Sequence, residues 1–485
     1  MIDRLLTTLT AVTVVSLVGV GQTSTLDHRY YPEELHEDLQ VLRKTIEQSH
    51  PDPFRYHTKA EMDLLFQSVD TTLRDPMTAE AFISKVMPVL RAIGDGNTTL
   101  AIPQAFASLY AHSLPMIPIT VGVLDGKLYV DQELKGFRSL PPGSELLRIN
   151  GRQASKILGK LRASQVPEGE DTTRMDRQIE AAFPELYLRF VESADVFNIE
   201  YKAPDGTLGT KTIHSMTRDE MTQSMGQRGF NLRSWRMEEL GDVHTGWLTL
   251  GSLDRKALEK EGIAPEKFLN SVRTALRKDG LSTLVIDLRG AGGEDTGLAD
   301  QVFSLIANSP YRLFKTMSVR SGNIPDSYKY AQPAPEFYAS LGVDFMPELN
   351  GRMSLKTDDP RLRMIAPDKD AFKGTVYVLC DGGTIDAAAA LVMLAKRSHR
   401  AKLVGGETGS NATSYCGGQV LQLTLPRTNC VLKVPLVRFV PDGDPGTATS
   451  RGEMPDHVVP QLPSGLADGT DVVRNALIQL IGELQ

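Results

Sequence analysis

Residues Gly374–Asn411 read GTVYVLCDGGTIDAAAALVMLAKRSHRAKLVGGETGSN, and this stretch decides the fold of the second half of the chain. The apolar, β-rich run Thr375–Cys380 predicts a short strand, which a DGG turn ends. The alanine- and leucine-rich run Asp386–Arg397 predicts a helix, and Ala401–Val404 starts the next strand. A parallel α/β layer places reactive groups at such a strand-to-helix turn. We therefore expect a functional position at Asp386, the first residue of the helix.

A second stretch of the same kind lies upstream. Leu281–Asp295, LSTLVIDLRGAGGED, is an apolar run that ends in a glycine loop, and a helical pattern follows over Thr296–Ile306. A continuous apolar run is typical of a parallel strand that is buried on both faces. The sequence thus predicts a mixed α/β fold built of βαβ and ββα units in this half of the chain.

The first half of the chain has a different pattern. We predict three helices first, then a hairpin around Asp125-Gly126, a helix and a second hairpin. The predicted segments are Pro32–Gln48, Lys59–Leu73, Thr78–Ile93, the hairpin MIPITVGVLDGKLYVD, Asp171–Glu192, Val196–Ala203 and Leu208–His214. Residues 311–370 are rich in loop-forming residues, and no element is predicted there.

Composition limits the class of function. The chain has 485 residues, with 41% hydrophobic and 23% charged residues, so we expect several folded domains. The net charge is −7 and no basic block is present, which argues against a nucleic-acid partner. The sequence shows no phosphate loop, dinucleotide fingerprint or metal-ligand spacing, so we expect neither a cofactor nor a metal.

The N-terminus has the features of an export signal. Arg4 precedes an apolar run from Leu5 to Val20, and small residues offer a cleavage site before Gln22. We expect residues 1–21 to be a signal peptide and the mature protein to be periplasmic or secreted, with no stable membrane span after cleavage. The alternative is an uncleaved anchor, but the run is short and diluted by threonines.

Three cysteines are present: Cys380, Cys416 and Cys430. Cys416 and Cys430 fall in one predicted hairpin whose turn is Pro426–Asn429. This register places Cys430 opposite Thr424 or Leu425, far from Cys416, and argues against a disulfide between them.

The motif GTIDAAA followed by GETG resembles the core of the C-terminal processing (tail-specific) serine peptidases. In that family a Ser heads the helix and is the nucleophile, and here Asp386 holds that position. The loop DLRGAGG resembles the family's oxyanion loop. The resemblance implies that backbone amides of this loop and of the residue after the nucleophile bind the oxyanion. The matching positions are Gly290, Gly292, Gly293 and Ala387.

The general base of the family is also missing. One branch uses a His in an IGDGHT-like segment, and this chain has IGDGNTTL with Asn97 in that position. The other branch uses a Lys soon after GETG, and Ser410, Asn411, Ala412 and Thr413 follow here instead. Some relatives carry a Glu at the position of Thr449. Since Asn has no useful basicity, the resemblance implies that acyl-transfer chemistry is lost.

Asp386 has a physical role to play without catalysis. We expect it to cap its helix, because Asp is among the best capping residues and its charge suits the helix dipole. On this hypothesis its carboxylate points into the old oxyanion pocket, accepts the amide hydrogen bonds there and stays ionised.

Several other residues are candidates for substitute catalytic groups, and each has a structural alternative. Thr384, Ser410 and Ser414 are interpreted as turn or loop residues, and His399 as a cation at a helix C-terminus. Glu294 and Asp295 could form a carboxylate cluster with Asp386, or could cap a helix or face solvent. His50 and His57 flank Pro-rich turns.

One further resemblance concerns the middle of the chain. PPGSELLRINGRQASKIL is similar to a segment of PDZ domains, which bind extended chain ends by adding a strand to a sheet edge. The matching residues are Gly143, Leu146, Ile149, Asn150 and Gly151. The alternative is an unrelated β-turn-helix unit.

These patterns predict four segments: a signal peptide (1–21), a helical domain (30–113), a PDZ-like module (114–220) and a peptidase-like domain (240–485). The first functional hypothesis is a homologue of tail-specific peptidases that binds polypeptide segments with little or no peptidase activity. The second is an active hydrolase that uses substitute residues.

Overall fold

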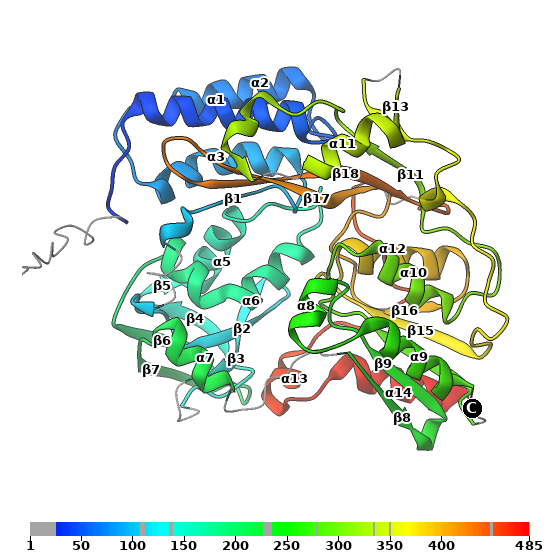
Figure 1. The fold of residues 1–485 in the computed structure, drawn as a ribbon. Helices are drawn as coiled ribbons and strands as arrows, with labels where there is room; N and C mark the ends of the chain where they lie inside the picture. Colours follow the sequence, from blue (N-terminus) through cyan, green and yellow to red (C-terminus); the bar gives the residue numbers. More distant parts are fainter. Residues whose placement is uncertain are drawn as a thin grey trace, which may run out of the picture.

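The computed structural model describes residues 26–106, 112–134, 139–226, 235–277, 280–332, 335–348, 351–446 and 450–484. They form a mixed α/β structure, as predicted, and its strands make three sheets (Figure 1). The expected signal peptide and Thr449 lie outside the described residues and stay predictions. Within the ranges above, no helix is both long and apolar enough to cross a bilayer.

Three helices follow one another at the N-terminal end of the described chain. They are α1 (Pro32–Ser49), α2 (Lys59–Asp70) and α3 (Ala79–Ile93). Thr58 and Thr78 cap α2 and α3, since each hydroxyl accepts a hydrogen bond from the amide three residues on. The predicted starts agree within one residue, although α2 ends three residues before the predicted Leu73.

A seven-stranded sheet lies against these helices (Figure 1). Its order is β12-β17-β18-β11-β14-β13, and β1 also pairs with β18. The strands are β1 (Thr99–Ala101), β11 (Phe314–Val319), β12 (Ala331–Gln332), β13 (Phe345–Pro347), β14 (Met353–Leu355), β17 (Tyr415–Thr424) and β18 (Val431–Pro441). The sheet therefore joins the N-terminal segment to the C-terminal half.

The region 311–370, for which the sequence predicted no element, supplies four strands of this sheet, β11 to β14. It also contains helix α11 (Pro335–Asp344) and the short 3-10 helices η2 (Asp326–Tyr330) and η3 (Pro360–Leu362). Its strands are two to six residues long, too short for a clear period-2 pattern. That is why sequence reasoning missed them.

The predicted hairpin of β17 and β18 has the expected register. The Leu425 amide and the Cys430 carbonyl form a hydrogen bond, and Cys416 lies opposite Arg438. All three cysteines are buried and unbridged, and the lack of a bridge between Cys416 and Cys430 agrees with the prediction.

A second sheet has the order β2-β3-β4-β6-β7, with β5 beside β4. The strands are β2 (Ile119–Leu124), β3 (Lys127–Glu133), β4 (Glu145–Ile149), β5 (Arg152–Gln153), β6 (Val196–Lys202) and β7 (Leu208–His214). Helices α5 (Ala154–Ala163) and α6 (Thr173–Phe190) share a separate hydrophobic core with it, and α7 (Arg218–Gly226) follows. Both predicted hairpins are present in this sheet.

The third sheet has the order β19-β16-β15-β10-β9-β8 and is parallel except between β8 and β9. The strands are β8 (Arg236–Leu240), β9 (Thr245–Thr249), β10 (Thr283–Asp287), β15 (Thr375–Cys380), β16 (Lys402–Gly405) and β19 (His457–Val458). Every residue of β10 is buried, as predicted for a parallel strand covered on both faces.

Helices cover both faces of this sheet. Val285 and Tyr377 share a core with α14 (Val472–Leu484) on one face. Leu284 and Val376, which point to the other face, share the main core with α10 and α12. The other helices on and around this sheet are α8 (Arg255–Lys260), α9 (Pro265–Leu276), α10 (Thr296–Ser304) and α12 (Asp386–Arg397), with the 3-10 helix η1 (Gly241–Val243). Helix α13 (Pro463–Asp468) lies instead against the second sheet.

Strands β10 and β15 are parallel neighbours, and Asp287 is level with Leu379. Their carboxyl ends therefore reach the same edge of the sheet. The glycine loop after β10 and the Asp381–Ile385 turn after β15 meet there. This edge is the place where open α/β sheets carry their sites.

Candidate functional site: a carboxylate at a strand-to-helix turn

Asp386 is held in an unusual backbone conformation. Its φ is +54°, in the left-handed region that few residues other than glycine adopt. Its amide donates a hydrogen bond of 2.8 Å to the Ser410 hydroxyl. Such strained residues persist where the surrounding structure imposes the conformation, as at active-site turns.

The predicted capping role of Asp386 is wrong. The N-cap position of α12 is Ile385, whose side chain makes no capping hydrogen bond, and the Asp386 amide is bound by Ser410 instead. Because Asp386 has a left-handed backbone, its carboxylate turns away from the helix amides. Its Oδ1 accepts a hydrogen bond of 2.7 Å from Nδ2 of Asn97 instead. The carboxylate therefore binds a side chain 289 residues away in sequence.

Asn97 and Asp386, which the sequence predicted to converge on one cleft, thus lie in direct contact. Asn97 Nδ2 also donates to the Cys416 carbonyl at 2.8 Å. Its Oδ1 accepts a hydrogen bond of 2.5 Å from Nη2 of Arg174. Both ends of the Asn97 amide are therefore engaged, which holds the side chain in one orientation.

Arg174 is the residue that sequence reasoning missed. It lies in the first turn of α6, is 4% exposed, and its Nη1 is 3.6 Å from Oε2 of Glu168. Gly96 makes room for it, because a Cβ at position 96 would be 2.6 Å from the Arg174 Cζ. Gly96 in the IGDGN segment is the one sequence signal of a close approach, but it does not say which side chain approaches.

Burial and neighbouring charges shift the pKa values of the carboxylates at this centre. Burial raises the pKa of Asp386, while the Arg174 guanidinium and the Asn97 hydrogen bond oppose the rise. Burial and the charge of Asp95 raise the pKa of Glu168 to about 8. The pKa of Asp386 is therefore raised and not lowered, because desolvation outweighs the hydrogen bond and the nearby cation.

Glu294 brings a second carboxylate close to Asp386 from the exposed rim of the site. It accepts a hydrogen bond of 2.5 Å from the Gly418 amide. Partial burial of its carboxylate and the charge of Asp386 raise its pKa. Asp295, by contrast, caps α10 by accepting a hydrogen bond from the Leu298 amide. Of Glu294 and Asp295, Glu294 is the residue that interacts with Asp386, and Asp295 belongs to the cap of α10.

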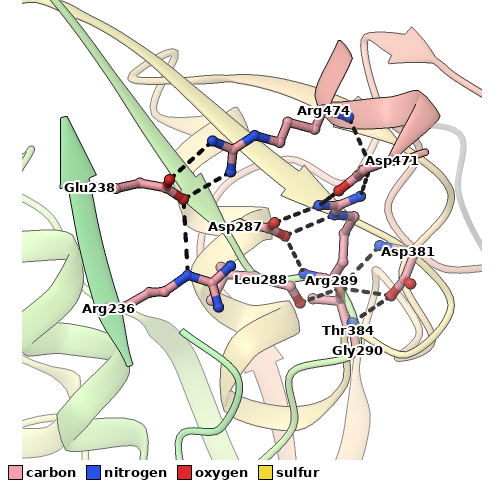
Figure 2. Close-up of polar contacts among 10 residues, drawn as sticks. All are labelled: Arg236, Glu238, Asp287, Leu288, Arg289, Gly290, Asp381, Thr384, Asp471 and Arg474. Carbon is pink, nitrogen blue, oxygen red and sulfur yellow. Dashed lines mark hydrogen bonds and ion pairs between the residues drawn. The ribbon is translucent and has the colours of Figure 1, made fainter. Parts of the chain in front are cut away.

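Ion pairs of Arg289 fix the start of the glycine loop (Figure 2). The Arg289 guanidinium forms hydrogen bonds with the carboxylates of Asp287 and Asp471, at distances of 2.6 to 2.9 Å. Asp381 accepts a hydrogen bond of 2.7 Å from the Gly290 amide and so ties this loop to the turn before Asp386. The glycine loop and the turn before Asp386 are thus held together.

The amides expected to bind an oxyanion are placed differently. The Ala387 amide donates a hydrogen bond of 3.1 Å to the Gly293 carbonyl, and the Gly290 amide is used by Asp381. The Gly292 carbonyl accepts a hydrogen bond from Leu253, and its Cα lies against Ile385. Ala387 and Gly290 therefore bond within the protein instead of facing a ligand.

The other candidates have structural roles or lie apart from Asp386. The Thr384 hydroxyl donates a hydrogen bond to the carbonyl of Leu288, directly after β10 (Figure 2), and the Ser410 hydroxyl accepts one from the Asp386 amide. Ser414 is buried, while His399 and His57 are exposed. Of this group only Ser410 touches Asp386.

His50 lies in a buried group with Asp95 and Cys416 whose ligand atoms are within 4.8 Å of one another. Its Nδ1 accepts a hydrogen bond from the Asp52 amide, so Nε2 carries the proton and donates to Asp95 at 2.9 Å. A metal would need the lone pair of Nε2. This donor set does not fit a metal, and the hydrogen bonds explain the cluster.

Comparisons with known proteins agree with this geometry. Residues 246–444 match the model of peptidase family S41. The structure of mature CPAF matches with 15% identity, 93% of this chain, 98% of that chain and a TM-score of 0.63. Mature CPAF complexed with lactacystin matches with 14% identity, 93% and 99% coverage and a TM-score of 0.65.

The photosystem II D1 C-terminal processing protease also matches, with 13% identity, 91% and 98% coverage and a TM-score of 0.42, and we rest no argument on it. No curated protein matches this chain in sequence. At these identities the solved structures show a shared fold. Residues 246–444 are thus similar to peptidase family S41, and the chain shares its fold with the solved structures of CPAF.

Proposed function

We propose that this protein binds polypeptide segments and has little or no peptidase activity. The observation that carries the proposal is the contact between Asp386 and Asn97 at the strand-to-helix turn. Acyl transfer needs a nucleophile, a base and oxyanion donors. A carboxylate and an amide stand in the first two positions, and the Ala387 amide is bonded to Gly293.

Several further parts of the proposal rest on sequence patterns. The expected signal peptide supports a periplasmic or secreted protein. The PDZ-like pattern supports a peptide-binding role for the middle of the chain, and the S41 region supports a polypeptide as the ligand. Export can be checked by asking whether the mature protein lacks residues 1–21 and is found outside the cytoplasm.

The second candidate is a hydrolase that uses carboxylates, and one observation favours it. Asp386 and Glu294 lie near each other, and the charge of Asp386 raises the pKa of Glu294. Two carboxylates that share a proton can divide the roles of acid and base. Glu294 is exposed, so a substrate could reach this pair.

A cleavage assay separates the two candidates. We would incubate the purified mature protein with unfolded polypeptides at pH 5 to 9 and identify fragments by mass spectrometry. Asp386→Ala, Glu294→Gln and a distant control, Asp205→Ala in the exposed β6–β7 turn, would be run beside it. We expect no fragments from any of them. Fragments that disappear in Asp386→Ala and Glu294→Gln, and persist in Asp205→Ala, would overturn the proposal in favour of the carboxylate hydrolase.

A further inference from the structure

A small hollow beside Gly417 of β17 lies next to the Asn97–Asp386 contact. A Cβ at position 417 would lie 3.4 Å from Oε2 of Glu294, 3.6 Å from Cε2 of Tyr415 and 3.7 Å from Nδ2 of Asn97. These are ordinary van der Waals distances, so the space holds an atom of methyl size without a clash. Asp386 borders this Gly417 hollow as well, because it accepts a hydrogen bond from the same Asn97 nitrogen.

The β17 backbone is irregular at the hollow. Its register with β18 shifts between Gly417 and Val420, and Gly418 has φ +69°. Such bulges are common beside functional sites, because they redirect backbone and side-chain groups. The Gly418 amide binds Oε2 of Glu294, while Oε1 makes no hydrogen bond within the described part of the chain. Because Glu294 is exposed, a ligand can approach the hollow from its side.

The Tyr415 side chain brings an unsatisfied polar group to the hollow. Tyr415 is 2% exposed, its ring is stacked on Phe439, and its hydroxyl has no hydrogen-bond partner among the described residues. Burial raises the pKa of Tyr415, and the charges of Asp386 and Glu294 add to the rise, which places the hydroxyl near both carboxylates. A buried hydroxyl without a partner is costly and uncommon. The Tyr415 oxygen therefore points to a ligand that donates hydrogen bonds.

Negative charge exceeds positive charge around the hollow. Arg174 is the cation that opposes the rise in pKa of both Asp386 and Glu294, and it also faces Glu168. One guanidinium thus serves three carboxylates. Carboxylates that are sheltered from water need a nearby cation or take up protons. Burial and the charge of Asp386 raise the pKa of Glu294 to about 8, and Asp254 adds to the rise. The hollow therefore favours a ligand that brings a positive charge.

We propose that the hollow binds the side-chain ammonium of a lysine in the bound polypeptide. An ammonium has three N–H donors, and Glu294, Asp386 and Tyr415 offer three oxygen acceptors. A divalent metal ion fits less well, because Asn97 Nδ2 and the Arg174 guanidinium, which are both donors, lie beside the carboxylates. The inference rests on the proposed function, since it names the residue type that the bound polypeptide presents to the centre.

Lysine binding should be linked to loss of a proton. Since the pKa of Glu294 is about 8, the free protein holds a proton there below that pH, and an ammonium favours the ionised form. The lysine itself stays charged, because its ordinary pKa is about 10.4. The charged groups that face Glu294 are Asp386 on α12, Arg174 on α6 and Asp254 at the start of α8. The pKa of Asp386 is raised as well, so both carboxylates make the affinity rise with pH.

The test compares two forms of one probe on the mature protein. Reduced and carboxymethylated α-lactalbumin is used unmodified and after acetylation of its lysines, which removes the ammonium charges. Dissociation constants are measured for the parent, for Gly417→Ala, which fills the hollow without changing a charge, and for Glu294→Gln. The matched controls are Gly159→Ala, at a helix position with nothing within 4 Å of an added Cβ, and Glu259→Gln, at an exposed position of α8. Thermal unfolding checks that each variant is folded.

We expect acetylation of the probe to weaken its binding to the parent about tenfold at pH 8, because hydrogen bonds to a charged group are lost. The same acetylation should change the affinity of Gly417→Ala and Glu294→Gln by no more than about twofold, whereas both controls should behave like the parent. Below pH 8 the affinity of the parent for the unmodified probe should fall, by up to about tenfold per pH unit. Glu294→Gln should lose most of this pH dependence.

The outcomes separate the lysine site from the proposed function. Equal binding of the two probe forms by the parent would overturn the lysine site and leave polypeptide binding standing. An acetylation effect that persists in Gly417→Ala would place the lysine elsewhere and overturn it too. Calorimetry with CaCl2 alone covers the metal alternative, since Ca²⁺ binding that disappears in Glu294→Gln would replace the ammonium by a metal ion. If neither probe form binds to any variant, polypeptide binding is wrong, and the lysine site fails with it.

Discussion

Helices α10 and α12 begin in the same way in sequence and differently in space. Each follows a buried parallel strand and a glycine-containing turn, and each has an Asp at its start. Asp295 caps α10 with its side chain and has an ordinary backbone, with φ −84°. Asp386 has φ +54°, caps nothing and bonds Asn97. Local capping explains the first Asp, whereas the second is explained by contacts that only the folded chain provides.

The comparison has a physical lesson about which residues hold a site together. The cap of α10 is local, because its donor lies three residues away, although Arg255 also pairs with Asp295. The start of α12 depends on Asn97, on Arg174 behind it and on the glycine loop. Substitutions far from Asp386 in sequence, at residues that contact it in the folded chain, should therefore affect the start of α12 more than substitutions at its sequence neighbours. The following variants test this difference.

The largest effect is expected from Arg174→Met. The variant leaves Glu168 and Asp386 buried without their cation, and removal of one partner of a buried pair costs about 3 kcal/mol of unfolding free energy. Arg162→Met, which breaks a partly exposed ion pair, should cost no more than about 1 kcal/mol. Urea denaturation at pH 8 measures both. Equal losses would mean that Arg174 is an ordinary helix residue.

The next effect concerns pH. Burial and Asp95 raise the pKa of Glu168 from 4.5 to about 8 in the folded state. Between these two values the folded protein holds a proton that the unfolded chain releases, so stability falls as pH rises. Glu168→Gln should flatten this decline, by at most about 1.4 kcal/mol per pH unit. Thermal unfolding from pH 5 to 9 would contradict the idea if the two profiles ran parallel.

The smallest effect tests the backbone at the two helix starts. Asp386→Gly should be about 1 kcal/mol more stable than Asp386→Ala, because only glycine adopts φ +54° without strain. At Thr296, the first residue of α10, the order should reverse, with glycine about 0.5 kcal/mol less stable than alanine. Chemical denaturation of the four variants gives both differences. The same order at both positions would refute strain at Asp386.

Much of the site's framework could be predicted from the sequence. The apolar runs predicted β10 and β15, and the Gly- and Ala-rich motifs placed Asp386 and the glycine loop at neighbouring turns. The sequence could not show whether the Asp386 side chain caps its helix. An Asp at a helix start implies a cap by propensity alone, but a left-handed backbone turns the carboxylate elsewhere. Propensity describes the local choice and does not include the surrounding contacts.

The sequence alone determined the α/β class, the loss of Ser and His from their expected positions, and the absence of a disulfide between Cys416 and Cys430, since period, motif and register are local or pairwise properties. Tertiary structure alone decided that Arg174 approaches Asn97, that Gly293 occupies the Ala387 amide, and that Arg177 and Glu180 cover Val123. These contacts join residues 54 to 94 positions apart by packing, and desolvation in that packing shifts the pKa values of the centre. Spacing along the chain carries no such information.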